Sequence, residues 1–269
     1  MSSAAKALDL LSHFSTARPE IGLSQLCRIA KRDKATTYRH LQALEEAGFI
    51  EQNAHTRHYR LGPAILHLAQ IREATVPRKQ GAESALSALA EATGETAHVS
   101  VLSGTTLYSL TSCESPRHAT RAVIDIVTHP LHATASGICT LAFGPEALFD
   151  IAIENLEGFT ASTPRTADAL AAMVNEVRDT GFCHANQSFE DEIRGIAAPI
   201  YDQTGLFAGT VSVASVASRF TPALELLIKS QLVNSSREIS RNWGGTVPAS
   251  IETAWAASLS SLNTLKDAS

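Results

Sequence analysis

The sequence predicts an α+β protein with two domains: a small helical N-terminal domain that carries a β-hairpin, and a larger C-terminal domain in which helices flank a sheet. Three short helical patterns and two short strand patterns fill residues 1–62. Apolar or alternating stretches follow near residues 97–113 and 193–216, and Gly104 and Gly205 interrupt them, as is typical of antiparallel hairpins. With 269 residues the chain is long enough to bury two separate cores.

Three predicted helices open the N-terminal domain. The first covers residues 4–14, and the second covers residues 23–30 with Ser24 as its expected N-cap. Asp33 is expected to cap the third helix, which ends at Gly48. A tight turn between the second and third helices makes the pair a helix-turn-helix.

The third helix has two distinct faces. Its buried face is predicted from the i, i+3, i+4, i+7 spacing of four residues, Thr37, His40, Leu41 and Leu44. The remaining side chains provide hydrogen-bond donors and positive charge near the start of the helix, which is where a recognition helix meets the major groove. The predicted DNA-contacting residues of this helix are Lys34, Ala35, Thr36, Tyr38, Arg39 and Gln42.

A β-hairpin is predicted directly after this helix. Residues 49–52 and 57–61 read as two short strands around a polar turn that contains Asn53. Arg57, close to the tip, is placed to reach a phosphate or the minor groove. Helix-turn-helix and hairpin together predict a winged helix-turn-helix that binds DNA. The alternative is a three-helix domain that binds another protein.

Charge is distributed unevenly along the chain. Residues 1–75 hold ten Lys and Arg against seven Asp and Glu, whereas residues 76–269 hold twelve against twenty. A basic module ahead of an acidic one is typical of a nucleic-acid binder with a separate solvated domain. Chance also produces a difference of this size, so it only supports the motif argument.

These residues carry a resemblance to a known family. The stretch KATTYRHLQALEEAGFIEQNAHTRHYRLGPAILHLAQ resembles the N-terminal part of the IclR family of bacterial transcription regulators. His40 stands where that family usually has Leu, which implies slightly more polar packing beneath the helix. The residues that match the family's pattern are Thr36, Tyr38, Arg39, Leu44, Gly48, Phe49, Tyr59, Leu61 and Gly62.

The rest of the chain is divided by its helical patterns. A helix over residues 64–74 resembles the family's linker helix, and the alternative is an extra helix of the first domain. Beyond Pro77 the strands described above lie among helices that include a long one from Thr221 to about Trp243. The predicted domains are residues 1–62 (winged helix-turn-helix), 63–77 (linker helix), 78–242 (effector domain) and 243–269 (helical extension).

The C-terminal half also resembles the IclR family, whose effector domain has a GAF-like α/β fold. The segments HPLHATASGICTLAF and GFCHANQSFEDEIRGIAAPIYDQTGLFAGTVSVAS carry this likeness, which spans roughly residues 2–242 in all. The resemblance implies an effector held between a loop and the sheet, with backbone N–H groups at a helix start that suit a carboxylate. The expected effector-binding residues are Ala135, Ser136, Gly137, His118, His129, Asn186, Gly195 and Ser212.

Three positions depart from the family pattern. Ala185 replaces a frequent acidic residue, Gly195 a frequent Cys or Ser, and Ala214 a hydroxyl residue. The departures predict a roomier, less polar pocket, in which His118, His129 and Asn186 supply hydrogen bonds.

The helical extension has an apolar stripe that includes Ile251, Trp255 and Leu259. Packing of this helix onto its own domain is favoured over a contact between subunits.

The resulting prediction is a cytoplasmic regulator that binds a near-palindromic operator in double-stranded DNA as a homodimer or a dimer of dimers. A small organic acid, aromatic or hydroxylated, is its expected effector, with no cofactor, metal, catalytic residue or membrane contact. Four scattered cysteines without a CxxC fit a reducing compartment. The alternatives are a hydrolase with Ser136 or a cysteine as nucleophile, and a metal- or redox-responsive regulator. The metal ligands would be drawn from His118, His129, His132, His184 and Cys183.

Overall fold

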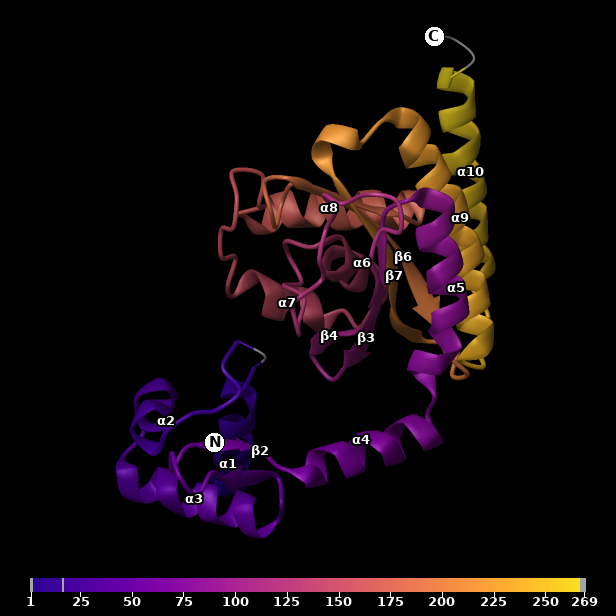
Figure 1. Cartoon of the computed structure of the whole chain (residues 1–269). Coiled ribbons are helices and arrows are strands. Elements are labelled where there is room, and N and C mark those ends of the chain that lie inside the picture. Colours follow the sequence, from indigo (N-terminus) through magenta and orange to yellow (C-terminus); the bar gives the residue numbers. More distant parts are fainter. Residues whose placement is uncertain (1, 16, 267–269) are drawn as a thin grey trace. The chain divides into compact units, whose positions relative to one another are not determined.

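A computed structural model describes the backbone of residues 2–15 and 17–266, and side chains as far as residue 261. The chain divides into two compact units, Met1–Pro77 and Arg78–Ser269 (Figure 1). Residues 267–269 of the predicted extension lie outside the described residues. Among the described helices, none combines the length and apolar character needed to cross a membrane.

The first unit contains the predicted helix-turn-helix and hairpin. The first predicted helix is an α-helix continued by a 3₁₀ turn at Leu10–His13. The prediction of Ser24 as N-cap was wrong, because the helix begins at Leu23 with Gly22 as its cap. The elements are α1 (Ser3–Asp9), α2 (Leu23–Ala30), α3 (Lys34–Glu46), β1 (Ile50–Gln52), β2 (Tyr59–Leu61) and α4 (Pro63–Thr75).

The predicted inner face of α3 is confirmed. Thr37, His40, Leu41 and Leu44 are its buried residues, and the two leucines join the core of the unit with partners such as Tyr59. His40 is accommodated because its Nε2 lies 3.2 Å from Ser3 Oγ. The His-for-Leu departure therefore gives this core one polar contact.

The second unit is built on one five-stranded antiparallel sheet with the order β4-β3-β7-β6-β5. Both predicted hairpins are present, and two short elements, α7 and β5, were not predicted. The elements are α5 (Arg78–Thr93), β3 (Thr96–Ser103), β4 (Thr106–Cys113), α6 (Ala135–Phe143), α7 (Ala147–Ile153), α8 (Ala167–Thr180), β5 (Cys183–Asn186), β6 (Ile193–Tyr201), β7 (Phe207–Val216), α9 (Pro222–Asn242) and α10 (Ala249–Lys266).

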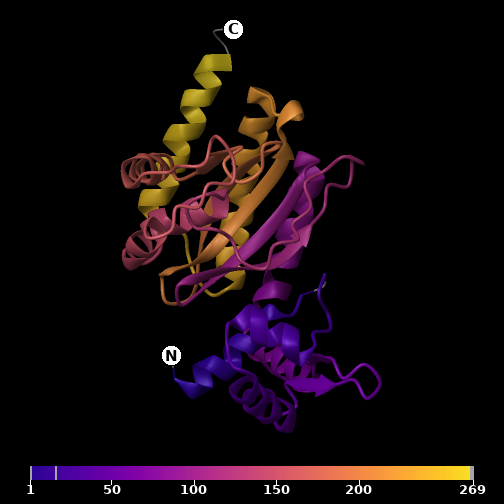
Figure 2. The same cartoon turned by 90° about the vertical axis from the view of Figure 1, so that its left-hand side faces the viewer.

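Helices cover both faces of this sheet (Figures 1 and 2). One face packs on α5 and α9, and the other on α6 and α8. Successive residues of a strand point to opposite faces. On β3, Val99 therefore joins the core beneath α5 and α9, whereas His98 faces the α6 side.

α10 packs on its own unit, as the apolar stripe predicted. Ile251 and Trp255 belong to the same core as α5 and α9, and Leu259 packs against it. Trp255 donates a hydrogen bond from Nε1 to the carbonyl oxygen of Gly181, at 2.8 Å. The extension therefore completes the core of the second unit.

Candidate functional site

The outer face of α3 is open to solvent at its start. Asp33 fixes this end, because its Oδ1 accepts a hydrogen bond from the Thr36 backbone N–H at 2.8 Å. Lys34 and Arg39 have no ion-pair partner within the described residues, and Tyr38 is 44% exposed. The six predicted contact residues of the helix are exposed, except Thr36, which is partly buried.

The tip of the hairpin presents Arg57. Asn53 Oδ1 accepts hydrogen bonds from the backbone N–H groups of His55 and Thr56, which closes the turn. Arg57 is exposed and has a left-handed backbone with φ 58°. Its neighbour Arg60 is instead paired with Glu51 at 2.6 Å. Arg57 is thus the hairpin arginine whose charge has no partner within the described part of the chain.

A groove lies beside these residues, and the sequence did not predict it. It is lined by the first residues of α2 together with Lys34, Tyr38 and Arg57. Gly22 has no side chain that could cap α2. No capping side chain therefore accepts a hydrogen bond from the first backbone N–H groups of this helix. A helix start flanked by two cationic side chains favours an anion such as a phosphate.

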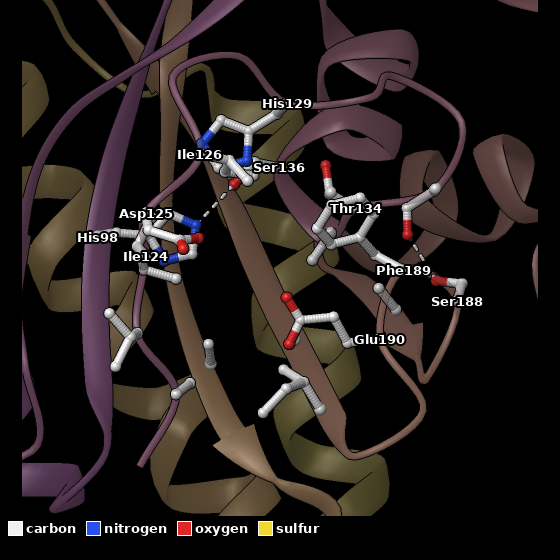
Figure 3. Close-up of a pocket in the computed structure, with 18 residues that line it drawn as sticks. His98, Ile124, Asp125, Ile126, His129, Thr134, Ser136, Ser188, Phe189 and Glu190 are labelled. Atoms are coloured by element: carbon white, nitrogen blue, oxygen red, sulfur yellow. Dashed lines mark hydrogen bonds between the residues drawn. The ribbon is translucent and has the colours of Figure 1, made fainter. Parts of the chain in front are cut away.

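A separate cavity of about 70 Å³ lies in the second unit, on the α6 side of the sheet (Figure 3). It is roofed by the loop that carries Ile124 and Ile126 and walled by the loop that carries Ser188 and Phe189. This volume is several times the minimum of roughly 10–15 Å³ that admits one water molecule, so the cavity can admit polar groups of a small organic compound.

Hydrogen bonds hold both loops in place. Thr96 Oγ1 donates to the Ala122 carbonyl oxygen at 2.7 Å, which ties the roof to β3. Ser188 Oγ donates to the Ala133 carbonyl oxygen, also at 2.7 Å, which ties the wall to the segment before α6 (Figure 3). Both loops that form the cavity are therefore anchored by hydrogen bonds of the chain itself.

The floor of the cavity consists of small residues. The register pairs Ala185 with Gly195 and Gly195 with Ala214, so the three lie in one row across β5, β6 and β7. All three line the cavity. A Cβ at Gly195 would lie 3.0 Å from Cβ of Ala135, so even an alanine there would crowd the start of α6. The three family departures thus fall at one place.

Two stacked histidines form one wall of the cavity. The ring centroids of His98 and His129 lie 5.4 Å apart, with 7° between the ring planes. Burial, with a smaller effect from His129, lowers the pKa of His98 to about 3. Burial also lowers the pKa of His129 to about 4. Both rings are therefore neutral at pH 7 and offer hydrogen bonds rather than positive charge.

A chain of buried hydrogen bonds orients His98. Ser136 Oγ lies 3.2 Å from His98 Nε2 and 2.6 Å from Ser212 Oγ. Ser100 Oγ lies 3.0 Å from His129 Nε2. His98 Nδ1 is buried and has no hydrogen-bond partner within the described residues.

The start of α6 opens into the cavity. Thr134 caps the helix by accepting a hydrogen bond from the Gly137 backbone N–H at 3.0 Å. Ala135 and Ser136 occupy the first two helical positions and line the cavity. Backbone N–H groups at these positions have no acceptor within a helix, so this end of α6 is the positive part of the cavity wall.

The eight predicted effector residues are not all brought together. Ala135, Ser136, His129 and Gly195 line the cavity, whereas the other four do not. A Cβ at Gly137 would overlap the carbonyl oxygen of Pro130, so this glycine packs against backbone. Ser212 lies beneath Ser136, fully buried.

The two remaining predicted residues lie elsewhere in the second unit. His118 has its Nε2 3.9 Å from Glu95. Asn186 is exposed at the end of β5.

Sequence reasoning missed several polar residues of this cavity, among them His98, Asp125 and Glu190. His98 lies on β3 next to Val99. Only the alternation of side chains along a strand could have predicted that His98 faces the cavity while Val99 faces the other side of the sheet. Asp125 and Glu190 also line the cavity, from the two loops. Loops have no periodicity from which side-chain direction follows, so no sequence signal identified these carboxylates.

Two family models match the chain. The model described as "Bacterial transcriptional regulator IclR C-terminal" matches residues 74–241, and the model described as "IclR helix-turn-helix domain" matches residues 3–54. The chain belongs to the IclR family. The expected membership and the α+β fold class, with an N-terminal helix-turn-helix and a C-terminal α/β domain, are thereby confirmed.

Similar proteins include two that are named as HTH-type transcriptional regulators. The chain is 25% identical over 244 residues to the HTH-type transcriptional regulator XynR of Escherichia coli, covering 90% of this chain and 97% of XynR. It is 26% identical over 247 residues to KdgR of the same organism, covering 91% and 93%. IclR-family membership therefore makes this chain one of a class of DNA-binding transcription regulators.

Solved structures of the family have the same fold. A putative IclR regulator from Silicibacter sp. TM1040 is 38% identical, with a TM-score of 0.87 over 93% of this chain and 99% of that one. An IclR homologue from Microbacterium hydrocarbonoxydans, complexed with 4-hydroxybenzoate, is 19% identical, with a TM-score of 0.73 over 89% and 100%. At 19% identity the second likeness concerns the fold alone.

The geometry bears on the metal and redox alternatives. Among the described residues, no group of three or more His, Cys, Asp or Glu side chains is placed to hold a metal ion. Burial raises the pKa of the thiols of Cys139 and Cys183, which keeps them protonated and unreactive.

The hydrolase alternative rests on Ser136 with His98 as its base. A ring with a pKa of about 3 is a weak base. No third residue orients that ring, because Nδ1 is unpartnered within the described residues.

Proposed function

We propose that this IclR-family chain is a ligand-responsive regulator in which residues 1–62 bind operator DNA and residues 78–242 bind a small molecule. Residues 63–77 form the linker helix, and residues 243–269 support the ligand-binding unit. The observation that carries the DNA-binding half is the polarity of α3. Its inner face is buried in the core, whereas its outer face presents exposed cationic and polar side chains, among them Lys34, Tyr38 and Arg39.

The outer face of α3 is assigned to base contacts. Arg39 is suited to a bidentate contact with guanine, and Gln42 to one with adenine. Thr36 and Tyr38 supply hydroxyl groups, and the absence of a long side chain at Ala35 allows close approach to a thymine methyl. Tyr38 and Arg39 are exposed, as these roles require.

Phosphate contacts are assigned to the groove beside α3. The uncapped start of α2, Lys34 and Arg57 surround that groove, and together they favour a DNA phosphate. Such contacts fix the position of the protein on the duplex and carry no sequence information themselves.

A homodimer, or a dimer of dimers, would place two copies of α3 on a near-palindromic operator, about one DNA turn apart. The exposed apolar side chains Leu66, Leu68 and Ile71 on α4 support pairing through the linker helix. A ligand changes DNA binding only if it has different affinities for two arrangements of the dimer.

The ligand is proposed to be a small acid with an aromatic or hydroxylated body. Its carboxylate would accept hydrogen bonds from the N–H groups at the start of α6, where Ala135 and Ser136 line the cavity. Neutral His98 and His129 would bind a hydroxyl group. That a relative of the same fold is complexed with 4-hydroxybenzoate supports this class.

Replacing Arg39 tests the DNA-binding half. Arg39→Ala should weaken binding to a promoter fragment roughly 10- to 100-fold, because one bidentate base contact is lost. Fluorescence anisotropy at physiological salt measures the affinity. Arg241→Ala is the matched control, because it removes an equal charge from an exposed position on α9. Equal affinities of the two variants would refute the assignment of α3 as the recognition helix.

A further inference from the structure

Two carboxylates lie at the cavity, and the proposed function leaves them without a role. Asp125 enters from the roof loop and Glu190 from the wall loop, so they come from segments far apart in the sequence (Figure 3). Neither carboxylate has a hydrogen bond or ion pair within the described residues. Both residues are exposed to solvent at the mouth of the cavity.

The two groups act on each other. Partial burial raises the pKa of Glu190, and the neighbouring Asp125 raises it further. Like charges at one site repel, and repulsion within a folded protein costs stability unless something compensates it. The two carboxylates do not stabilise the fold through hydrogen bonds or ion pairs, because neither makes one within the described residues.

Nothing in the cavity wall provides that compensation. No Lys or Arg is among the lining residues, and the two histidines are neutral at pH 7. Two oxygen ligands are too few for a metal ion, and no third ligand joins them among the described residues. Water solvates the exposed carboxylates in the free protein, and among bound partners an organic cation fits two carboxylates with no third ligand.

Another part of the cavity wall has the reverse character. The start of α6 presents backbone N–H groups at Ala135 and Ser136, which favour an anion. His98 lines the same cavity and is only 7% exposed. Its Nδ1 is buried and has no hydrogen-bond partner within the described residues. The cavity lining thus includes a positive part, at the start of α6, and a negative part, at Asp125 and Glu190.

We infer that the natural ligand is a small zwitterion, with a carboxylate at the start of α6 and an ammonium group between Asp125 and Glu190. This inference rests on the proposed ligand-binding role of the cavity, keeps the carboxylate of the proposed ligand and changes its second polar group. An amino group takes the place of the hydroxyl that the sequence led us to expect. Asp125 and Glu190 are then the residues that distinguish an amino acid from a hydroxy acid of the same skeleton.

Matched pairs of compounds test the inference. Calorimetric titration of the full chain compares 4-(aminomethyl)benzoate with 4-(hydroxymethyl)benzoate, and 4-aminobutanoate with 4-hydroxybutanoate. In at least one pair the amino compound should bind about tenfold more tightly or better, as expected for a charge-assisted contact. The preference should fall to about onefold in an Asp125→Asn/Glu190→Gln variant. Glu192→Gln, an exposed carboxylate of the same loop that does not line the cavity, should retain it.

The outcomes separate this inference from the proposed function. Hydroxy compounds that bind as tightly as the amino compounds, or a preference that survives in the double variant, would overturn the zwitterion and leave a ligand-binding regulator. Absence of binding by all four compounds would overturn the zwitterion and the ligand half of the proposed function together. The wild-type comparison needs no variant, and the double variant should melt no lower than wild type because it removes a repulsion.

Discussion

The hydrogen-bonded chain at the cavity wall makes a quantitative prediction. In Ser136→Ala, His98 is left with neither ring nitrogen paired, and the Ser212 hydroxyl loses its partner. Ser136 and Ser212 are almost completely buried, at 1% and 0% exposed, so water does not readily replace the lost contacts. Each of these two newly unsatisfied buried groups costs roughly 1–3 kcal/mol, so we expect a loss of about 2–6 kcal/mol.

The stability losses caused by Ser136→Ala and Ser212→Ala should not be additive. Ser212→Ala removes one of the two contacts of Ser136 and leaves the contact to His98, so we expect a loss of about 1 kcal/mol. The double variant leaves only His98 unpaired, and its loss should not exceed that of Ser136→Ala. The double-mutant cycle therefore predicts a coupling of at least about 1 kcal/mol.

Differential scanning calorimetry measures this cycle on the full chain. For a unit of this size each kcal/mol corresponds to roughly 2–4 °C in Tm. Ser103→Ala, at an exposed strand end, is the control and should lie within about 0.5 kcal/mol of wild type. Strictly additive losses would refute the reasoning, because they would mean that the two hydroxyls do not depend on each other.

Three further predictions concern pH, salt and the cap of α3. The pKa values of His98 and His129 are about 3 and about 4 in the folded unit, against an ordinary histidine value of 6.5. Below pH 6.5 the unfolded chain therefore binds more protons than the folded one. The Tm of the second unit should therefore fall as the pH falls from 6.5 towards 4; a rise would contradict the buried neutral rings. Lys34→Ala and Arg57→Ala should each reduce the slope of log K against log salt by about 0.9 in anisotropy titrations, and unchanged slopes would exclude phosphate contacts. Asp33→Ala should lower the Tm of the first unit whereas Asp33→Asn should not, because Asn also caps a helix; equal melting would show that the cap is unimportant.

Periodic elements were predictable from the sequence, because burial imposes their pattern. The inner face of α3 follows from apolar residues three and four apart, and the 193–216 hairpin from its glycine turn and apolar strands. β5 has only four residues and α7 only seven, so neither is long enough to show a period. The N-cap of α2 was misplaced for a tertiary reason. Ile21 pairs with Tyr59 through two backbone hydrogen bonds, which fixes the chain so that the helix begins directly after Gly22.

The ligand cavity was predictable only in part. The small residues of its floor were recognised because Ala185, Gly195 and Ala214 depart from a family pattern, and the register then places them in one row. The carboxylates at the mouth lie on loops whose path is set by distant contacts. Thr96 holds the roof loop, and no local pattern encodes that hydrogen bond.

Selection from a library of random-sequence DNA duplexes tests the central claim most directly. The full chain should enrich an inverted repeat whose half-sites lie about one helical turn apart, and Arg39→Ala should lose or relax that preference. Enrichment of no sequence by the wild-type chain, with or without the four test compounds, would contradict the claim that the outer face of α3 reads DNA.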